Sequence, residues 1–388
     1  MATKSTQVTL FQPPPLDPSK APIENVLELT PVLDIGPDVF TNTRPLWHPP
    51  GARGIYGGAA IAQCLSAAQR TVPADFTVHS MHCYFVLAGD SEIPILYHVE
   101  RVRDGKSYAT RTVQARQRGR PIFTTTLSFS KEDSGGKRKL EHAMPMPDVP
   151  LPEEDDTPTE SGGGGPFESR RAGILNRDSP NPEDKKVRQF IRARGEITGG
   201  HQAHLSALAY MSDSYFIGTV SRVHHIPRFS SPAALQSALK SLKNPSDLDD
   251  DTIRRYVKEL AEQEQEAAEK FLSNRNELSR EAFAAAAAAA VSKSRRCSNN
   301  NNNSKKSDQV IGMMVSLDHT IYFHNPRAFR ADEWLFTEMD SPWAGEGRGL
   351  VTQRMWNKDG VLIATCVQEG VVRLKQDDPV PTSRNAKL

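Results

Sequence analysis

Long apolar runs are missing from this chain of 388 residues. The most apolar stretch, residues 282–291, consists mostly of alanine and is too short to cross a bilayer. Residues 1–22 contain no apolar segment of the signal-peptide type, and several prolines interrupt them. The sequence therefore predicts neither a membrane span nor a secretory leader, and residues 1–22 are expected to form a flexible N-terminus.

Cysteine is scarce as well. The four cysteines show no CxxC or Cys/His spacing, and they are Cys64, Cys83, Cys297 and Cys366. Such a pattern argues against a disulfide framework and against a structural metal site. It favours free thiols in a reducing compartment, with most of them serving as small apolar side chains.

Excess charge of either sign is also absent, because the formal net charge at pH 7 is only +1. The bulk electrostatics therefore give no reason to expect nucleic acid or an anionic membrane as a partner. A G-x-S-x-G motif is not present, so the serine mechanism of α/β-hydrolases has no nucleophile elbow. With 37% hydrophobic and 24% charged residues, the chain is predicted to be globular and long enough for two domains.

Two stretches of biased composition divide the chain. Residues 131–166 are polar, acidic and rich in Pro and Gly, which is typical of a linker. Residues 229–308 contain a charged helical stretch (residues 249–278), seven consecutive alanines and an asparagine-rich run. We interpret residues 229–308 as an insertion, and its helical stretch as a solvated helix or a partner-binding arm.

The segments that remain repeat one pattern. Residues 55–58 (IYGG) and residues 197–200 (ITGG) each precede a helical pattern. Strand-like segments follow in both copies, VHSMHCYF from residue 78 and SLDHTIYF from residue 316. Each copy then ends with a turn and another strand. A Gly-Gly turn, a helix and several strands, repeated once, predict an α+β fold built from a duplicated unit.

Three polar residues in these patterns are candidates for a site. Asp213 recurs at helical spacing with Leu205, Ala209 and Phe216, so it is either a cap or surface group or a buried acid with a partner. Gln368 follows alternate apolar residues on one strand, as a structural or a functional amide.

The third candidate, Ser316, lies in a stretch that alternates. Strict alternation predicts a half-exposed strand with Ser316, Asp318, Thr320 and Tyr322 on one face and Val315, Leu317, His319 and Ile321 on the other.

Several segments together resemble the acyl-CoA thioesterase II family, which includes bacterial and peroxisomal enzymes. They include GIYGGAAIAQCLSAAQRTVP, VHSMHCYF, LAYMSDSYF, SLDHTIYFH and DGVLIATCVQEGVVR, and the resemblance covers roughly residues 25–130, 185–228 and 309–375. The resemblance implies two fused hotdog folds, in each of which an antiparallel sheet wraps a long helix. The expected domains are residues 23–130 and residues 167–375, the second interrupted by the insertion, and then a tail (residues 376–388).

The resemblance also implies a mechanism in which Asp213, Ser316 and Gln368 orient a water molecule that attacks the thioester of an acyl-CoA substrate. Asp213 would be the general base, and Ser316 and Gln368 would hold the water. The Gln368 NH₂ group, or backbone N–H groups at a helix start, would stabilise the oxyanion. Neither a cofactor nor a metal is implied.

Two alternative functions bind the same substrate. A hotdog hydratase or dehydratase would use an Asp/His pair, and a set of acid, hydroxyl and amide without a paired histidine argues against it. A non-catalytic acyl-CoA-binding protein would not need the acid, so the intact trio argues against that function.

Candidate substrate-binding residues are the glycine pairs Gly57–Gly58 and Gly199–Gly200, together with His79. Glycine lets a ligand approach the backbone closely, but it also permits a tight strand-to-helix turn. A histidine in a strand pattern positions substrate or belongs to a core or an interface, and the same alternatives apply to His82 and His319.

The chain ends in Ala386-Lys387-Leu388, which is close to the S-K-L peroxisomal address. This tail predicts recognition by the peroxisomal import receptor and a location in the peroxisomal matrix. Because exposed hotdog sheets commonly pair, the protein is also expected to form a homo-oligomer.

Overall fold

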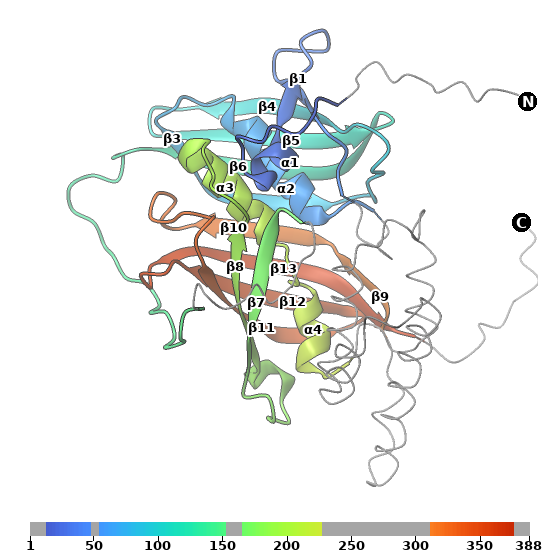
Figure 1. Cartoon of the computed structure of the whole chain (residues 1–388), viewed down its shortest axis with the longest axis vertical. Coiled ribbons are helices and arrows are strands. Elements are labelled where there is room, and N and C mark those ends of the chain that lie inside the picture. The colour runs from blue at the N-terminus through green and yellow to red at the C-terminus, as the bar shows by residue number, and fades with distance from the viewer. Residues whose placement is uncertain (1–12, 48–53, 153–164, 227–310, 376–388) are drawn as a thin grey trace, which may run out of the picture.

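The computed structural model describes residues 13–47, 54–152, 165–226 and 311–375, which fold as two similar halves (Figure 1). The first half contains α1 (Pro22–Leu27), β1 (Leu29–Pro31), β2 (Val39–Asn42), α2 (Gly57–Gln69), β3 (Phe76–Phe85), β4 (Leu96–Asp104), β5 (Tyr108–Gln117) and β6 (Arg120–Lys131). The second half contains β7 (Phe167–Leu175), η1 (Pro182–Asp184), β8 (Lys186–Ala193), α3 (Gly200–Met211), α4 (Gly218–Val223), β9 (Ile311–Ser316), β10 (Asp318–Phe323), β11 (Leu335–Gly345), β12 (Arg348–Trp356) and β13 (Leu362–Leu374).

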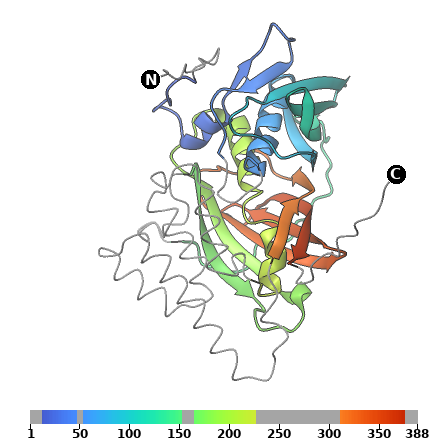
Figure 2. The ribbon, with the colours of Figure 1, turned by 90° about the vertical axis from the view of Figure 1, so that its right-hand side faces the viewer.

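One curved antiparallel sheet runs through both halves (Figure 2). The order of its strands is β1-β2-β4-β5-β6-β3-β10-β13-β12-β11-β8-β7, and β9 pairs with β13. The halves are joined where β3 pairs with β10, with Met81 opposite Ile321 and Cys83 opposite His319. The predicted α+β double hotdog, with a long helix wrapped by antiparallel strands in each half, is confirmed.

The two long helices pack against each other in opposite directions inside the sheet. Ser66 Oγ in α2 lies 3.0 Å from Ser206 Oγ in α3, and Gln69 Nε2 at the end of α2 donates to the carbonyl of Gln202 in the first turn of α3. Nearly every residue of α2 is buried, because sheet and helix surround it on all sides. The start of α2 therefore lies beside the end of α3, across the boundary between the halves.

The N-terminal segment is ordered further upstream than its composition indicates. The Asp17 N–H donates to Asn25 Oδ1 at 2.9 Å, and the Pro15 carbonyl accepts a hydrogen bond from Arg44. Ala21 is buried ahead of α1. Residues 15–22 of the expected flexible N-terminus are thus held by hydrogen bonds and packing, and residues 1–12 lie outside the described residues.

Part of the expected linker lies on the outer face of the second half. Met146 and Val149 pack against a buried cluster that includes Phe336 and Trp356, and Trp356 Nε1 donates to the carbonyl of Met144. Composition alone did not indicate this contact, because two apolar residues are diluted among prolines and acidic residues.

The remaining calls on domain organisation lie outside the described residues. They are the middle of the linker (residues 153–164), the whole insertion (residues 229–308) with its helical stretch and Cys297, and the tail from residue 376 onward. Within the described ranges, Cys64, Cys83 and Cys366 are buried free thiols, as predicted. No helix in these ranges has the length and apolar character needed to span a membrane.

Candidate active site

Asp213 follows the end of α3 and is held by groups from two other elements. Its Oδ1 accepts a hydrogen bond of 2.9 Å from Gln368 Nε2 on β13. The carboxylate also accepts the backbone N–H of Gly58, in the first turn of α2. The structure therefore brings two of the three predicted catalytic residues into direct contact and adds a donor from the other half.

The glycine pair at the start of α2 permits this contact. A Cβ at Gly57 would lie 2.8 Å from Asp213 Oδ2, and one at Gly58 would collide with the carbonyl oxygen of Tyr210. A side chain at either position would thus push α2 away from the acid. The positive end of the helix dipole also points toward the carboxylate, which stabilises its ionised form. Close approach explains these two glycines, since neither has a positive φ.

Burial raises the pKa of Asp213 to about 6, although the hydrogen bonds from Gln368 and Gly58 act in the opposite direction. The carboxyl group is therefore mostly ionised at neutral pH while keeping a basicity close to that of the medium. These are the properties of an efficient general base. Asp213 is only partly shielded from solvent, whereas Gln368 is completely buried.

Both N–H groups of Gln368 are used within the protein. One reaches Asp213 Oδ1, and the other reaches His319 Nδ1 at 3.0 Å. The amide oxygen, Gln368 Oε1, is buried without a hydrogen-bond partner among the described residues. The unused group of Gln368 is therefore an acceptor, which suits a water molecule, and the expected role of its NH₂ group at the oxyanion stays a prediction.

His319 belongs to this site, a role that the sequence analysis left open. Its side chain is completely buried on β10, its Nε2 lies 3.0 Å from Ser212 Oγ, and the ring contacts Phe216 edge-on. Burial lowers the pKa of His319 to about 3, so the imidazole is neutral. A histidine thus lies beside the predicted set, but it does not form an Asp/His pair. This histidine contacts Gln368 rather than Asp213.

Ser316 lies on the face opposite to the one that strict alternation predicts. Along β10, Thr320 pairs with Val367 of β13, whereas Ser316 at the end of β9 pairs with Gly370, one residue out of step. The break falls at Leu317. A one-residue offset exchanges the faces of a strand, so Ser316 shares a face with Gln368, two residues from Gly370. Within the described residues, no hydrogen bond joins Ser316 to Asp213 or Gln368.

The first half carries a different set of side chains at the equivalent positions. The repeated sequence patterns align Thr71 with Asp213 and Met81 with His319. Leu127 lies opposite Met81 in the sheet, in the position that Gln368 holds opposite His319.

In the first half, a buried arginine is hydrogen-bonded to Thr71, the residue that aligns with the acid. Arg111, opposite Leu127 on β5, is completely buried, and it donates to Thr71 Oγ1 at 2.8 Å and to the Thr71 carbonyl at 2.9 Å. Its counterpart opposite Gln368 is Val351. Of the two equivalent positions, only the one in the second half is equipped for acid–base chemistry.

The remaining predicted residues are not brought to Asp213. Gly199 and Gly200 begin α3, so they are roughly 18 Å from its far end at 1.5 Å per residue. The Gly199 N–H there donates to the Glu24 carboxylate at 2.7 Å. His79 bonds Ser128 Oγ at 2.8 Å and precedes Phe85, whose ring lies beside Gly57, by roughly 20 Å of strand.

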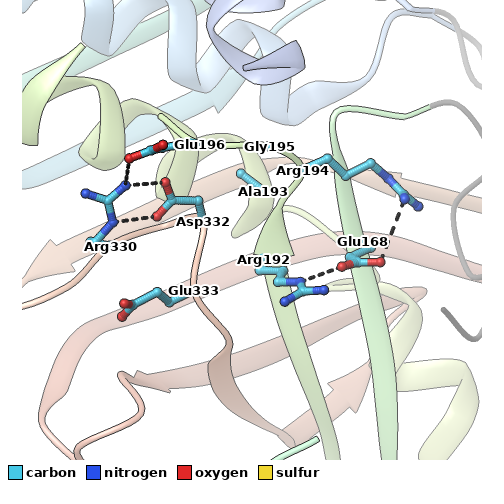
Figure 3. Close-up of a pocket in the computed structure, with 9 residues that line it drawn as sticks. All are labelled: Glu168, Arg192, Ala193, Arg194, Gly195, Glu196, Arg330, Asp332 and Glu333. Atoms are coloured by element: carbon cyan, nitrogen blue, oxygen red, sulfur yellow. Dashed lines mark hydrogen bonds and ion pairs between the residues drawn. The ribbon is translucent and has the colours of Figure 1, made fainter. Parts of the chain in front are cut away.

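A pocket on the surface of the second half contains none of the predicted residues (Figure 3). Its arginines are paired with carboxylates: Arg330 with Asp332 at 2.6 Å, and Arg192 with Glu168 at 2.5 Å. Because these charges offset one another, the pocket is not an obvious anion site. In the described part of the chain, no group of three His, Cys, Asp or Glu side chains is arranged to hold a metal ion.

The sequence matches two family models. Residues 44–130 match the acyl-CoA thioesterase N-terminal domain, and residues 146–372 match the acyl-CoA thioesterase C-terminal domain. Human acyl-coenzyme A thioesterase 8 is 31% identical over 93% of this chain and 92% of its own length. The rat protein of the same name is 33% identical over 91% of this chain and 89% of its own.

Solved structures show the same architecture. An acyl-CoA thioesterase II from Mycobacterium marinum, 25% identical, covers 92% of this chain and 99% of its own, with a TM-score of 0.57. A tesB protein from Mycobacterium avium subs paratuberculosis, 22% identical, covers 90% and 98%, with a TM-score of 0.55, and supports the fold. Given the two matched domains and the relatives above 30% identity along nearly the whole chain, this protein belongs to the acyl-CoA thioesterase family.

Proposed function

We propose that the protein hydrolyses fatty acyl-CoA to a free fatty acid and CoA by direct attack of a water molecule that Asp213 deprotonates. The observation that carries the proposal is the hydrogen bond of 2.9 Å between Gln368 Nε2 and Asp213 Oδ1, beside the start of α2. One group is a base with a pKa of about 6, and the other presents an unpaired acceptor.

The geometry supports one assignment of roles to Asp213, Gln368 and Ser316. A water molecule next to Asp213 donates one hydrogen to the carboxylate and the other to Gln368 Oε1, which leaves an oxygen lone pair for the thioester carbonyl carbon. Ser316, on the same face of the sheet, would supply a third contact. As the C–O bond forms, Asp213 takes the proton. The tetrahedral intermediate then collapses, the C–S bond breaks, and Asp213 returns the proton to the departing CoA sulfur.

The oxyanion needs donors as well, and both N–H groups of Gln368 already have acceptors in the protein. We assign it to the start of α2, where the Gly57 N–H lies beside the Gly58 N–H that holds Asp213. A substrate carbonyl in this position also explains why neither glycine can carry a side chain. The proposed substrate contacts therefore centre on Gly57 and Gly58, because Gly199, Gly200 and His79 lie too far from Asp213 to touch the reacting atoms.

The hydratase or dehydratase alternative requires a histidine that exchanges a proton with substrate. His319 has no such freedom, since both ring nitrogens face protein groups and the side chain is completely buried. A non-catalytic binding protein would have no use for a carboxylate with a raised pKa beside an amide whose oxygen has no partner among the described residues. Hydrolysis is the reaction that uses the basic Asp213 carboxylate, the unpaired Gln368 oxygen and the neutral, fixed His319 together.

Release of free CoA, followed with a thiol reagent across acyl chain lengths, tests the reaction. The wild-type protein is expected to release CoA in proportion to enzyme concentration, and the Asp213→Asn variant is expected to release little. Conversion of the acyl-CoA into another CoA thioester without release of free CoA would support the hydratase, and binding without conversion would support the non-catalytic protein.

We further propose that the enzyme acts in the peroxisomal matrix as a homo-oligomer. The support is the terminal Ala386-Lys387-Leu388, outside the described residues, which the import receptor would bind. A yeast relative, 34% identical over 32% of this chain, is named peroxisomal acyl-coenzyme A thioester hydrolase 1. A fluorescent fusion that ends at Leu388 should enter peroxisomes, and one residue added after Leu388 should leave it in the cytosol.

A further inference from the structure

The orientation of the Gln368 amide is critical to the mechanism proposed above, because a rotated amide would aim its oxygen at Asp213. An ionised carboxylate only accepts hydrogen bonds, so the nitrogen of Gln368 must face Asp213 Oδ1. The same nitrogen lies 3.0 Å from His319 Nδ1. His319 Nδ1 must therefore be the unprotonated nitrogen of the ring.

The other side of the ring fits this tautomer. A neutral imidazole that accepts at Nδ1 carries its proton on Nε2, which lies 3.0 Å from Ser212 Oγ. The Ser212 hydroxyl in turn donates to the Ala209 carbonyl at 2.9 Å, so its oxygen is free to accept from His319. Ser212 precedes Asp213 in the chain, and the contacts close a ring through Ser212, His319, Gln368 and Asp213.

We propose that His319 is a positioning residue, which holds the Gln368 amide so that Oε1 faces the attacking water. This inference depends on the function proposed above for Gln368. Gln368 and His319 are both completely buried. An N–H of Gln368 without an acceptor would therefore cost free energy, and His319 Nδ1 provides that acceptor. Without that acceptor, Gln368 would be held through Asp213 alone, and the two carboxylate oxygens would allow several orientations of the amide.

Two substitutions separate the two sides of the imidazole. The side-chain oxygen of His319→Asn can stand where Nδ1 stands, so the contact with Gln368 is kept and the contact with Ser212 is lost. The longer side chain of His319→Gln places its terminal group near Nε2, which keeps the contact with Ser212 and loses the acceptor for Gln368. Both variants alter the packing against Phe216, so each serves as the folding control of the other.

Steady-state kinetics, normalised to folded protein by circular dichroism and thermal melting, test the proposal. For His319→Gln we expect kcat to fall by about tenfold or more with KM changed less than about threefold, because the interaction with the transition state is the one that is lost. For His319→Asn we expect kcat within about threefold of wild type. Equal losses in the two variants, or a larger loss in His319→Asn, would overturn the proposal.

The tautomer can be measured without an activity assay. In protein labelled with ¹⁵N-histidine, the His319 ring is expected to carry its proton on Nε2 and to show an unprotonated Nδ1. A proton on Nδ1 would overturn the inference even in an active enzyme. If instead wild-type protein hydrolyses no acyl-CoA but shows the expected tautomer, the proposed function fails while the hydrogen-bonded arrangement stands, and the positioning role is then rejected with the function.

Discussion

Asp213 and Gly58 belong to different halves of the chain, yet the backbone N–H of Gly58 donates a hydrogen bond to the Asp213 carboxylate. The acid of the second half is therefore completed by the helix start of the first. This contact depends on the antiparallel packing of α2 and α3, which sets the first turn of one helix against the last turn of the other.

Gly57→Ala should lower turnover strongly. The added Cβ would lie 2.8 Å from Asp213 Oδ2 and 2.8 Å from the ring of Phe85, so the carboxylate must move. We expect kcat to fall by about tenfold or more, since displacements of about 1 Å at a reacting group have effects of this size. Gly199→Ala is the matched control, because its Cβ would crowd Glu24 and Ala203 at 2.9 Å at the other helix start. The control should lose thermal stability while each folded molecule keeps near-normal turnover. Equal kinetic defects in the two variants would contradict the assignment.

Asp213→Asn should leave acyl-CoA binding nearly unchanged and lower kcat by about 10²-fold or more, because the amide cannot accept the proton. Gln368→Ala should also lower kcat. The double variant should lose far less than the product of the two single effects, because residues that hold one water molecule act as a unit. Near-normal turnover per folded molecule in Asp213→Asn would mean that the acid is only structural.

Ser316→Ala tests the face to which the register offset assigns this residue. We expect a measurable fall in kcat, because the hydroxyl shares a sheet face with Gln368. Thr320→Ala is the control on the outer face of β10, where Thr320 Oγ1 contacts His82, and it should keep normal kinetics. The same small effect in both variants would remove Ser316 from the site.

The pH dependence of kcat/KM should follow the ionisation of Asp213. Because the base is active without its proton, activity is expected to rise with pH through a midpoint near the pKa of about 6. Initial rates between pH 4.5 and 8, compared with rates for Asp213→Asn, provide the measurement. A wild-type profile that is flat across pH 6 would argue against Asp213 as the base.

The contribution of Asp213 to the free energy of unfolding should show the opposite trend with pH. Folding raises the pKa of Asp213 from 3.8 to about 6, so between these values the folded state binds the extra proton and stability falls as pH rises. The cost is up to about 3 kcal/mol above pH 6. Folding lowers the pKa of His319 from 6.5 to about 3, so this residue contributes a slope of opposite sign over much of the same range. The contribution of Asp213 must therefore be taken from the difference between wild type and Asp213→Asn in urea unfolding at pH 4 and pH 7. A difference that does not change with pH would contradict the raised pKa.

Much of the fold could be predicted from the sequence, and the family resemblance grouped Asp213 with Gln368. Helical spacing put Asp213 on the apolar stripe of a helix, although it follows the end of α3. Alternation placed Gln368 on an apolar strand face, and the repeated Gly-Gly pattern revealed the duplication. The family resemblance then joined these elements into one architecture. Long apolar periodicities determine elements of this kind, which makes them visible before any tertiary contact is known.

Other features depended on contacts that periodicity does not encode. The offset at Leu317 moved Ser316 to the other face, because a bulge is set by pairing with the neighbouring strand and not by the strand's own pattern. His319 resembled an ordinary core residue, and only its position opposite Gln368 distinguished it. The two glycine pairs looked alike in sequence, although Gly57–Gly58 meets Asp213 whereas Gly199 meets Glu24 at the other helix start.

The two halves carry different side chains at equivalent positions, Thr71 with Arg111 in the first and Asp213 in the second, and this difference has a consequence for the way the two units are joined. In a symmetric dimer of single hotdog chains, any substitution appears in both subunits, so a residue that suits one position must also be tolerated at the other. Joining the two units into one chain removes that constraint. In this chain the first half has an arginine that secures the end of α2, and the second half has an acid whose desolvation is costly. Two such different environments are compatible with one fold because the two units need not share a sequence.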